Sequence, residues 1–291
     1  MGQPPAARTA LGPMFIVAVE QYLPVEKRLV HDPLASRLLP LGLRLAAQIG
    51  RWPGAHDWMA TAVERKAPGI WGGVLCRKRY IDDKVREAVA TGVRQLVVLG
   101  AGLDTRAHRF AAEHGVRAFD VDLPANIEAK RRRLAGTPES LRRDVALVRL
   151  DFESDDLGQC LARNGFGADQ AAVFVWEAVT QYLTEDAVRR TLRFLGTAAS
   201  GSRLVFTYVR GDFLAGTYLY DAEPLYRDFV VDRQAWRFGL HPEEVDGLLR
   251  QHGWAEREQV GADDYLTRYL HPRGRSLPVS EIERCVHAER R

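Results

Sequence analysis

The feature that most constrains the fold is an apolar run that passes directly into a glycine-containing loop, in the segment Gln95 to Arg109, QLVVLGAGLDTRAHR. Four apolar residues in a row, Leu96 to Leu99, are typical of a strand that is buried on both faces, as in the centre of a parallel sheet. The glycines that follow, Gly100 and Gly102, let the backbone approach a ligand without a Cβ in the way. We therefore expect a small molecule to bind where this strand ends.

A second short strand ends in acids, in the segment Phe119 to Pro124, FDVDLP. An acid at the end of the second strand can accept hydrogen bonds from both hydroxyls of a ribose. The dinucleotide pattern G-x-G-x-x-G is incomplete, because Thr105 stands where its third glycine belongs. A pyrophosphate site is therefore disfavoured, and the loop favours a nucleoside cofactor such as S-adenosylmethionine. On these residues alone, a plain tight turn in a doubly wound sheet is an equal alternative.

Composition narrows the class of protein. With 291 residues the chain can form one large α/β domain with an added helical cap. Its formal net charge is only +3, which does not indicate a nucleic-acid partner. Cys76, Cys160 and Cys285 lie in no metal-ligand pattern, so we expect a reducing compartment and no metal. No signal peptide and no bilayer-spanning apolar run are evident, so we expect a soluble, cytoplasmic protein without a membrane partner.

The hydrophobic periodicity changes near residue 92. Residues 1 to about 12 are expected to be a loose tail, and the pattern of residues 1–91 predicts a helical N-terminal cap with several proline breaks. Strands alternating with helices then predict right-handed β-α-β units and a parallel sheet. The predicted strands span residues 95–100, 117–121, 146–150, 171–176 and 203–209, with helices such as 124–134 and 185–195 between them.

The alternation ends after the fifth strand. Residues 210–240 are rich in aromatics and acids, and we expect them to form a lid-like insertion over the strand ends. A helix is predicted over 242–252, followed by strands at 254–260 and 265–270 that a tight turn would make antiparallel. A mostly parallel sheet with an antiparallel C-terminal hairpin is typical of the Rossmann-like methyltransferases, so residues 92–291 are expected to form such an α/β core.

Four motifs occur in a restrictive order: CRKRYIDD (76–83), LGAGLDTRAHRF (99–110) with FDVDLPANIEAK (119–130), RLDF (149–152), and VWEAVTQYLTEDAV (175–188). In that order and spacing the chain resembles the leucine carboxyl methyltransferase family. This family includes protein phosphatase methyltransferases and many bacterial O-methyltransferases, some of which act on polyketide carboxylates. The resemblance covers about Arg77 to Val209, and it implies a class I methyltransferase fold with S-adenosyl-L-methionine as cofactor.

Carried over by position, the resemblance assigns the methionine carboxylate of the cofactor to Arg77, whose planar guanidinium can form a bidentate pair with it. Arg79, two residues on, is a rival for this role. Gly100 would approach the methionyl part of the cofactor, and Gly102 and Asp104 would shape the loop. An Asp at the start of a helix also caps free backbone N–H groups, so part of this motif can serve the fold.

The resemblance also implies a role for each remaining acid. Asp122 would take the ribose hydroxyls, with Asp120 as its neighbour or as a second ligand. Asp151 and Phe152 would hold the adenine, because a carboxylate can accept from its exocyclic amine and an apolar ring packs on the base. Glu177 would lie near the sulfonium and the amino group, an ordinary buried ion pair being the alternative.

The acceptor side is less well defined by the sequence. The chain departs from the family at Ala178, which is usually Gly, and at Thr180 and Gln181, which are usually apolar. Tyr182 either lines the acceptor pocket or packs its ring at a helix start. Arg210 and the aromatics that follow it would suit an acidic, partly aromatic substrate, although packing within a lid explains the same aromatics.

The sequence therefore predicts an S-adenosylmethionine-dependent O-methyltransferase acting on a small molecule. A carboxylate is ionised at about pH 7 and can attack directly, whereas a phenol or alcohol benefits from a general base. The motifs contain no His-Asp or Lys arrangement that marks such a base, and His108 is expected on a helix, so a carboxylate acceptor, polyketide-like acids included, is favoured. The alternatives are a phenolic or other hydroxyl acceptor, a nicotinamide-dependent oxidoreductase, and a cofactor-binding sensor that has lost catalysis.

Overall fold

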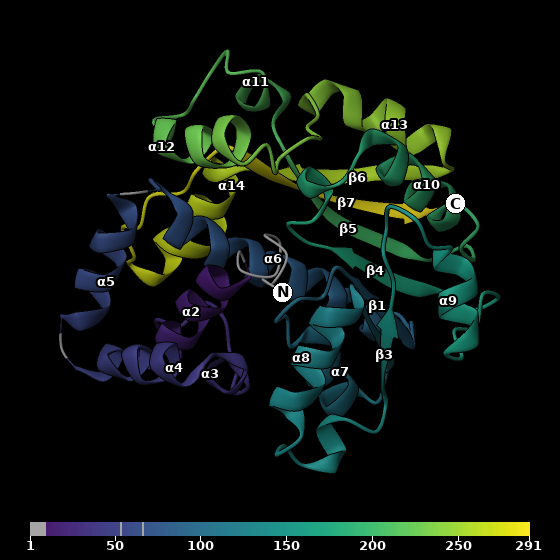
Figure 1. Ribbon diagram of the computed structural model, residues 1–291, viewed down its shortest axis with the longest axis horizontal. Helices are drawn as coiled ribbons and strands as arrows, with labels where there is room; N and C mark the ends of the chain where they lie inside the picture. Colours follow the sequence, from purple (N-terminus) through teal and green to yellow (C-terminus); the bar gives the residue numbers. More distant parts are fainter. Residues whose placement is uncertain (1–9, 53, 66) are drawn as a thin grey trace.

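Seven strands form one mixed sheet in the computed structural model, which describes residues 10–52, 54–65 and 67–291; most of the expected N-terminal tail lies outside these residues. The strand order is β3-β2-β1-β4-β5-β7-β6 (Figure 1). β1 to β5 pair in parallel, and β7 pairs antiparallel with both β5 and β6. The strands are β1 (Gln95–Leu99), β2 (Arg117–Asp122), β3 (Val145–Arg149), β4 (Ala172–Trp176), β5 (Arg203–Val209), β6 (Trp254–Val260) and β7 (Glu283–Arg290). The predicted α/β architecture is confirmed.

Helices precede the sheet, connect its strands and follow β5. Those before the sheet are α2 (Leu11–Glu20), α3 (Ala35–Leu38), α4 (Leu41–Gln48), η1 (Ile49–Arg51), α5 (Ala55–Glu64) and α6 (Ile70–Ala90). Those between β1 and β5 are α7 (Arg106–His114), α8 (Pro124–Leu134), η2 (Glu139–Leu141), α9 (Leu157–Arg163), η3 (Thr180–Tyr182) and α10 (Glu185–Leu195). The later ones are α11 (Gly211–Leu214), α12 (Glu223–Tyr226), the π-helical η4 (Arg227–Asp232), η5 (Pro242–Glu244), α13 (Val245–Gln251), α14 (Ala262–Tyr265), the π-helical η6 (Leu266–Leu270) and η7 (His271–Arg273).

The central strand β1 explains why the sheet is covered on both faces. Successive side chains of a strand point to opposite faces, so Leu96 and Val98 pack in one core with residues of α2 and α6. Val97 and Leu99 pack in a second core with residues of α9, α10 and α13. The apolar run therefore forms a strand that is buried on both faces, between β2 and β4.

Helix α6 joins the N-terminal helices to the sheet. It packs on α2 and α5 and also on β4 and β5. Trp71, Leu75 and Tyr80 are fully buried within it. Its buried residues also include two cations, Arg77 and Lys78, which reach the cavity described below.

The antiparallel pairing at the C-terminus is confirmed, but the expected position of its second strand is wrong. Residues 265–270 are helical, because Tyr265, Tyr269 and Leu270 are buried together at helical spacing. The second strand is β7, whose ends are charged and whose Glu, Arg and Ala residues do not favour a strand. Its buried centre pairs with β5 on one side and β6 on the other, so tertiary contacts override the local propensity.

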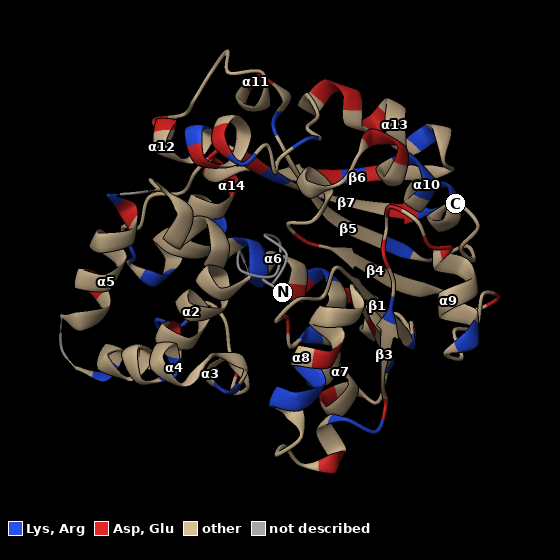
Figure 2. Ribbon diagram, viewed as in Figure 1, with Lys and Arg blue, Asp and Glu red and all other residues tan. Residues whose placement is uncertain are grey.

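The charged residues are spread over the molecule, and Figure 2 shows Lys and Arg interspersed with Asp and Glu along most of the elements. Within the described residues, no helix is both long and apolar enough to cross a membrane. The same part of the chain contains no cluster of three His, Cys, Asp or Glu residues that could hold a metal ion.

Candidate functional site

A cavity of about 470 Å³ lies where β1, β2, β3 and β4 end at their carboxyl edge. Ligands of open α/β sheets bind at this edge. All but one of the site residues expected from the sequence line it, which brings together positions more than a hundred residues apart along the chain. They are Arg77, Gly100, Gly102, Asp104, Asp122, Asp151, Phe152, Glu177 and Tyr182.

The loop after β1 turns through two left-handed residues. Gly100 has φ +68° and Gly102 has φ +45°, a region that L side chains rarely adopt. A Cβ on Gly100 would lie 2.3 Å from Cγ2 of Val179. Only glycine at this position lets the backbone run along the floor of the cavity.

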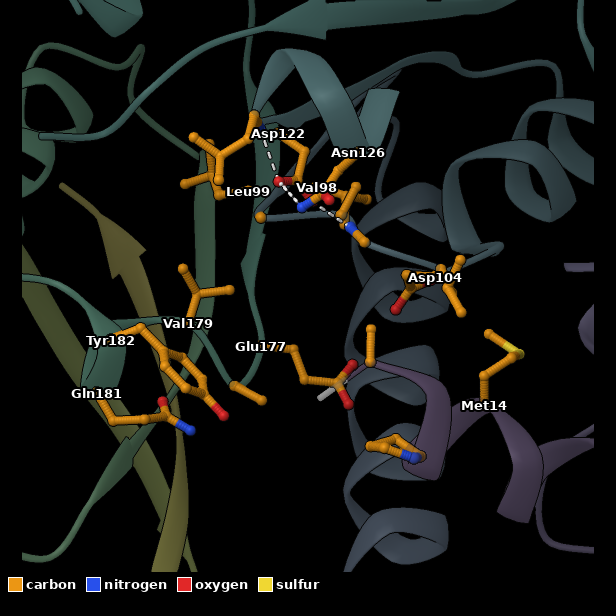
Figure 3. Close-up of a pocket in the computed structure, with 18 of the residues that line it drawn as sticks. Met14, Val98, Leu99, Asp104, Asp122, Asn126, Glu177, Val179, Gln181 and Tyr182 are labelled. Atoms are coloured by element: carbon orange, nitrogen blue, oxygen red, sulfur yellow. Dashed lines mark hydrogen bonds between the residues drawn. The ribbon is translucent and has the colours of Figure 1, made fainter. Parts of the chain in front are cut away.

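The carboxylate of Asp122 is held at the upper side of the cavity in Figure 3. Its Oδ2 accepts a hydrogen bond from the N–H of Gly102 at 2.5 Å, and its Oδ1 accepts from the side-chain amide of Asn126 at 2.8 Å. Burial raises the pKa of Asp122, and these donors only partly offset the effect. Asn126 was not predicted, although it lies one helical turn after Asp122 in the same motif.

Asp120 does not line this cavity. It is fully buried and forms ion pairs with Lys130 and with Nε2 of His108, the latter at 3.3 Å. Burial opposes its ionisation, but Lys130 and His108 hold the pKa of Asp120 below its ordinary value. The alternative of Asp120 as a ribose ligand is therefore not supported. Asp120 instead ties β2 to α8 and to α7, on which His108 lies as expected.

Glu177, directly after β4, is the centre of a charged cluster. Its Oε1 accepts from Nε of Arg77 at 2.9 Å, and its Oε2 accepts from Arg106 at 3.2 Å and from Nζ of Lys78 at 3.3 Å. Burial opposes ionisation of Glu177, yet Lys78, Arg77 and Arg106 together lower its pKa. Glu177 is thus an anion at the cavity wall with three cations beside it.

Arg77 reaches a second carboxylate, Glu283 at the start of β7, and forms an ion pair with it. Burial opposes the charge of Arg77, but Glu283 and Glu177 outweigh it and raise the pKa of the guanidinium. Arg79, the rival position, is not among the residues that line the cavity and pairs with Asp83 of the same helix at 2.9 Å. The structure therefore favours Arg77 of the two.

Asp104 has both of the roles considered for it. Its Oδ1 accepts from the backbone N–H of Arg106 at 2.6 Å, as at a helix start. Its Oδ2 accepts from the side chain of Arg106 at 2.6 Å and from Lys78 at 3.1 Å. Burial opposes its ionisation, but Arg106, Lys78 and Lys130 lower the pKa of Asp104. The loop is therefore fixed to the charged cluster.

The loop after β3 offers an aromatic ring beside a carboxylate. Phe152 is 8% exposed and stacks on Trp176 with ring centroids 6.3 Å apart. Asp151 accepts a hydrogen bond from the backbone N–H of Glu153 at 2.9 Å. Glu153 also lines the cavity and accepts from Arg237 at 3.0 Å. A flat aromatic base fits such surroundings.

The opposite wall is largely apolar and comes from segments far apart in the sequence. Phe229 and Trp236 stack with centroids 4.9 Å apart, and the Trp236 ring meets the Tyr182 ring edge-on at 6.4 Å. The wall residues of α2 and α6 were not predicted, because they precede the first of the four sequence motifs. The apolar residues of this wall, here called the acceptor wall, are Leu11, Met14, Ile70, Val74, Leu225, Phe229 and Trp236.

The segment between β4 and η3 carries a backbone irregularity. Ala178 has φ +55°, although it is not glycine, and its N–H donates to the Thr207 hydroxyl at 2.8 Å. A left-handed residue with a Cβ costs about 1–2 kcal/mol. This geometry explains in physical terms why glycine suits the position.

The expectation that Arg210 positions the substrate is corrected by the structure. Arg210 is not among the residues that line the cavity. Its guanidinium pairs with Asp212 at 2.8 Å and with Glu281 at 3.4 Å, and it lies over the Tyr220 ring. These neighbours hold the side chain within the segment that follows β5.

Comparison with known proteins places these residues in context. The family model described as leucine carboxyl methyltransferase matches residues 10–196. That range contains the charged cluster apart from Glu283, but it ends before Leu225, Phe229 and Trp236 of the acceptor wall.

Relatives are similar over most of their length. A proposed S-adenosyl-L-methionine-dependent methyltransferase of Streptomyces coelicolor is 31% identical over 252 residues, covering 84% of this chain and 82% of the relative. One from Mycolicibacterium gilvum, described in the same way, is 33% identical over 261 residues, covering 84% and 83%.

Solved structures share the fold. A proposed methyltransferase of Thermobifida fusca superposes with a TM-score of 0.57 at 19% identity, covering 81% of this chain and 88% of that one. A DUF574 family protein of Streptomyces avermitilis gives 0.54 at 17% identity, covering 82% and 92%. At these identities the likeness concerns the fold alone.

Proposed function

Because the chain belongs to the leucine carboxyl methyltransferase family and is an S-adenosyl-L-methionine-dependent methyltransferase, we propose that it methylates a carboxylate of a small molecule to form a methyl ester. One observation carries the proposal: within the described residues, no histidine lines the cavity, and the acceptor wall is apolar. A carboxylate acceptor is ionised at about pH 7 and needs no base, whereas a phenol with a pKa of about 10 does.

Two acids of the cavity are poorly suited to deprotonate a phenol. Asp104 and Glu177 are paired with cations that lower their pKa values, so they hold a proton weakly. Lys78 lies within 3.3 Å of both carboxylates and forms an ion pair with each. The chemistry that this site supports best is attack by an oxygen that is already an anion.

The residues present fit the cofactor. The cofactor supplies a methyl group on a positively charged sulfur. We assign its methionine carboxylate to Arg77 and its amino group to Glu177, since each is a buried charge of the opposite sign at the cavity wall. The Gly100 turn leaves room for the methionyl part, where a Cβ would meet Val179. Asp122 would accept from the ribose hydroxyls.

We assign the adenine to Asp151 and Phe152 at the loop after β3. The chain's own contribution to the reaction is then positioning, because the attacking oxygen must lie about 3–3.5 Å from the methyl carbon and in line with the bond that breaks. Tyr182 projects into the cavity opposite Glu177 (Figure 3), and we propose that it positions the acceptor.

The segment 210–240 is proposed to close over the bound acceptor. It supplies Leu225, Phe229 and Trp236 to the acceptor wall, and closure would exclude water from the reacting atoms. If so, protease cleavage within this segment slows when the cofactor and an acceptor bind. Equal cleavage rates would contradict the closure.

The aromatic wall favours an apolar acid, polyketide-like acids among them. The three cysteines are unpaired, which favours a reducing, cytoplasmic location, and the relatives named above come from bacteria. We propose a bacterial enzyme of small-molecule metabolism.

The experiment that tests the function has two steps. Calorimetric titration with S-adenosylmethionine, S-adenosylhomocysteine and NAD is expected to give binding of the first two alone. A panel of carboxylic acids, phenols and amines is then incubated with the cofactor, and the products are treated with alkali. Methyl esters release methanol in alkali, whereas methyl ethers and methylamines do not. Alkali-stable products would overturn the carboxylate proposal, and binding without any turnover would favour a sensor.

A further inference from the structure

Two neighbouring residues of η3 are polar where the family resemblance predicts apolar ones. Only one of them has a hydrogen-bond partner for its side-chain oxygen. Thr180 is fully buried, and its hydroxyl donates to the backbone oxygen of Thr207 at 2.8 Å. Gln181 is 3% exposed, and its Oε1 is buried without any hydrogen-bond partner. Buried polar groups are nearly always hydrogen-bonded, so the unmet oxygen of Gln181 requires an explanation.

The amide of Gln181 lies at the place where an acceptor would bind. Gln181 lines the cavity, and in Figure 3 the side chains of Gln181 and Tyr182 enter from the same side and point toward its centre. The backbone of Gln181 is fixed, because its carbonyl accepts from the N–H of Arg237 at 2.7 Å. The backbone that carries this neutral polar side chain is therefore anchored, and the side chain lines the same cavity as the acceptor wall.

We propose that Gln181 selects acids that carry a hydrogen-bond donor beside the carboxylate, that is, hydroxy or acylamino acids with an apolar body. The inference rests on the proposed function, in which a carboxylate is methylated. A primary amide presents a donor and an acceptor in one plane. Its N–H can donate to the carboxylate oxygen that is not methylated, while Oε1 accepts from the neighbouring O–H or N–H.

This arrangement leaves the chemistry balanced. The other carboxylate oxygen forms the new bond to the methyl carbon, the electron pair of the broken bond stays on sulfur, and no proton moves. An acid without the neighbouring donor would leave Oε1 buried and unpaired in the complex. A site built to accept a hydrogen bond discriminates strongly against an analogue that lacks the donor.

Matched acceptors test the selection. We expect the purified enzyme to methylate phenyllactate over phenylpropanoate, and salicylate over benzoate, by at least about tenfold in kcat/KM. In Gln181→Leu the ratio falls to about one, since the unmet oxygen is gone. Thr180→Val, the matched control, keeps the preference. Equal use of the paired acids by the unaltered enzyme, or a preference that survives in Gln181→Leu, would overturn the inference.

Thermal melting supplies a readout that needs no acceptor. Gln181→Leu is expected to raise Tm by about 2–4 °C, because an apolar side chain replaces a buried, unpaired amide. Thr180→Val is expected to lower Tm, because a satisfied hydrogen bond is lost. A fall in Gln181→Leu similar to that in Thr180→Val would assign the amide to the fold and overturn the inference.

The two proposals fail in different ways. Ester formation without any preference between the paired acids rejects the role of Gln181 and leaves the proposed function standing. Alkali-stable products from hydroxy acids reject the proposed function, and the assignment of the amide N–H to a carboxylate falls with it.

Discussion

The two walls of the cavity are built in opposite ways. The wall around Glu177 is a cluster of buried charges in which each carboxylate is paired, and its members come mainly from the part of the chain that the family model matches. The acceptor wall is aromatic and aliphatic, and Phe229 and Trp236 lie beyond that part. The other four residues of the acceptor wall, Leu11, Met14, Ile70 and Val74, lie inside it. The contrast in chemistry supports the proposal that the charged wall holds the cofactor and the apolar wall contacts the acceptor.

The walls also differ in what a ligand must change. Buried charges are tolerated only when paired, and Arg77 is already paired with Glu177 and Glu283. Under the proposed assignment, a cofactor carboxylate would replace Glu283 as a partner of Arg77 or share the guanidinium with it. The acceptor wall has no such pairs to break, so substitutions there should change acceptor recognition without changing cofactor affinity.

The largest effect is expected from Arg77→Ala, which removes one of the three cations around Glu177. Two carboxylates would lose a partner, and the cofactor would lose its own, so the Kd for S-adenosylmethionine in calorimetry should rise by about 100-fold or more. Arg77→Lys keeps the charge but not the planar fork, and should give an intermediate loss. Arg79→Ala is the matched control from the same helix and should bind normally. Equal losses in the two alanine variants would remove the distinction between them.

The second-largest effect is expected from low pH, which should weaken the charged wall around Glu177 and leave the acceptor wall unchanged. The pKa values of Asp104 and Glu177 are lowered in the folded protein, so the stability that they contribute is present above the unfolded value of about 4 and is lost as pH falls through the folded values. The free energy of unfolding, measured with urea, should therefore fall between about pH 4 and pH 2. Asp104→Asn should flatten this slope and Phe229→Ala should not. A slope unchanged in Asp104→Asn would assign acid sensitivity to another region.

Phe229→Ala tests the acceptor wall alone. Loss of the ring that stacks on Trp236 should raise KM for an apolar acid by about tenfold, which corresponds to about 1.4 kcal/mol. The Kd for the cofactor should stay within about twofold of the original. If cofactor affinity fell as much as acceptor affinity, the two walls would not be independent.

The smallest effect is expected at Ala178, where the walls meet. Ala178→Gly removes the left-handed strain and should stabilise the protein by up to about 1 kcal/mol, offset in part by the flexibility of glycine in the unfolded chain. Urea unfolding measures the difference, and Ala187→Gly, in the regular helix α10, provides the contrast because it should destabilise. A destabilising Ala178→Gly would show that the strain is not stored at this residue.

The sequence predicts the wall around Glu177 better than the acceptor wall for a physical reason. Asp122 ends β2, Glu177 directly follows β4 and Asp104 lies in the loop after β1. Parallel strands bring their carboxyl ends to one edge, so local motifs suffice to place these acids. Glu283 pairs with Arg77, which lies 206 residues earlier in the chain, because it stands at the start of β7. The composition of β7 does not predict a strand. Such a contact depends on the whole sheet, which no local pattern encodes.

Arg210 illustrates the opposite error. Its residue type suited an acidic substrate, but Asp212 and Tyr220 lie close enough in the chain to occupy the guanidinium. Phe229 and Trp236 belong to the segment expected over the strand ends, yet which of its aromatics reach the cavity depends on tertiary packing. In the sequence, Gln181 is notable only because the family usually has an apolar residue there. That its Oε1 is buried without a hydrogen-bond partner is visible only in three dimensions.

The position of β7 has a consequence for how the protein is made. The last strand of the chain is not at the edge of the sheet but between β5 and β6. During synthesis β5 therefore emerges from the ribosome before the strand that covers its edge, and β6 has no neighbouring strand until β7 follows it. The nascent chain carries an open strand edge through that interval, and an open edge can pair with other chains. A ribosome that stalls between β6 and β7 would thus release an aggregation-prone product that also lacks Glu283.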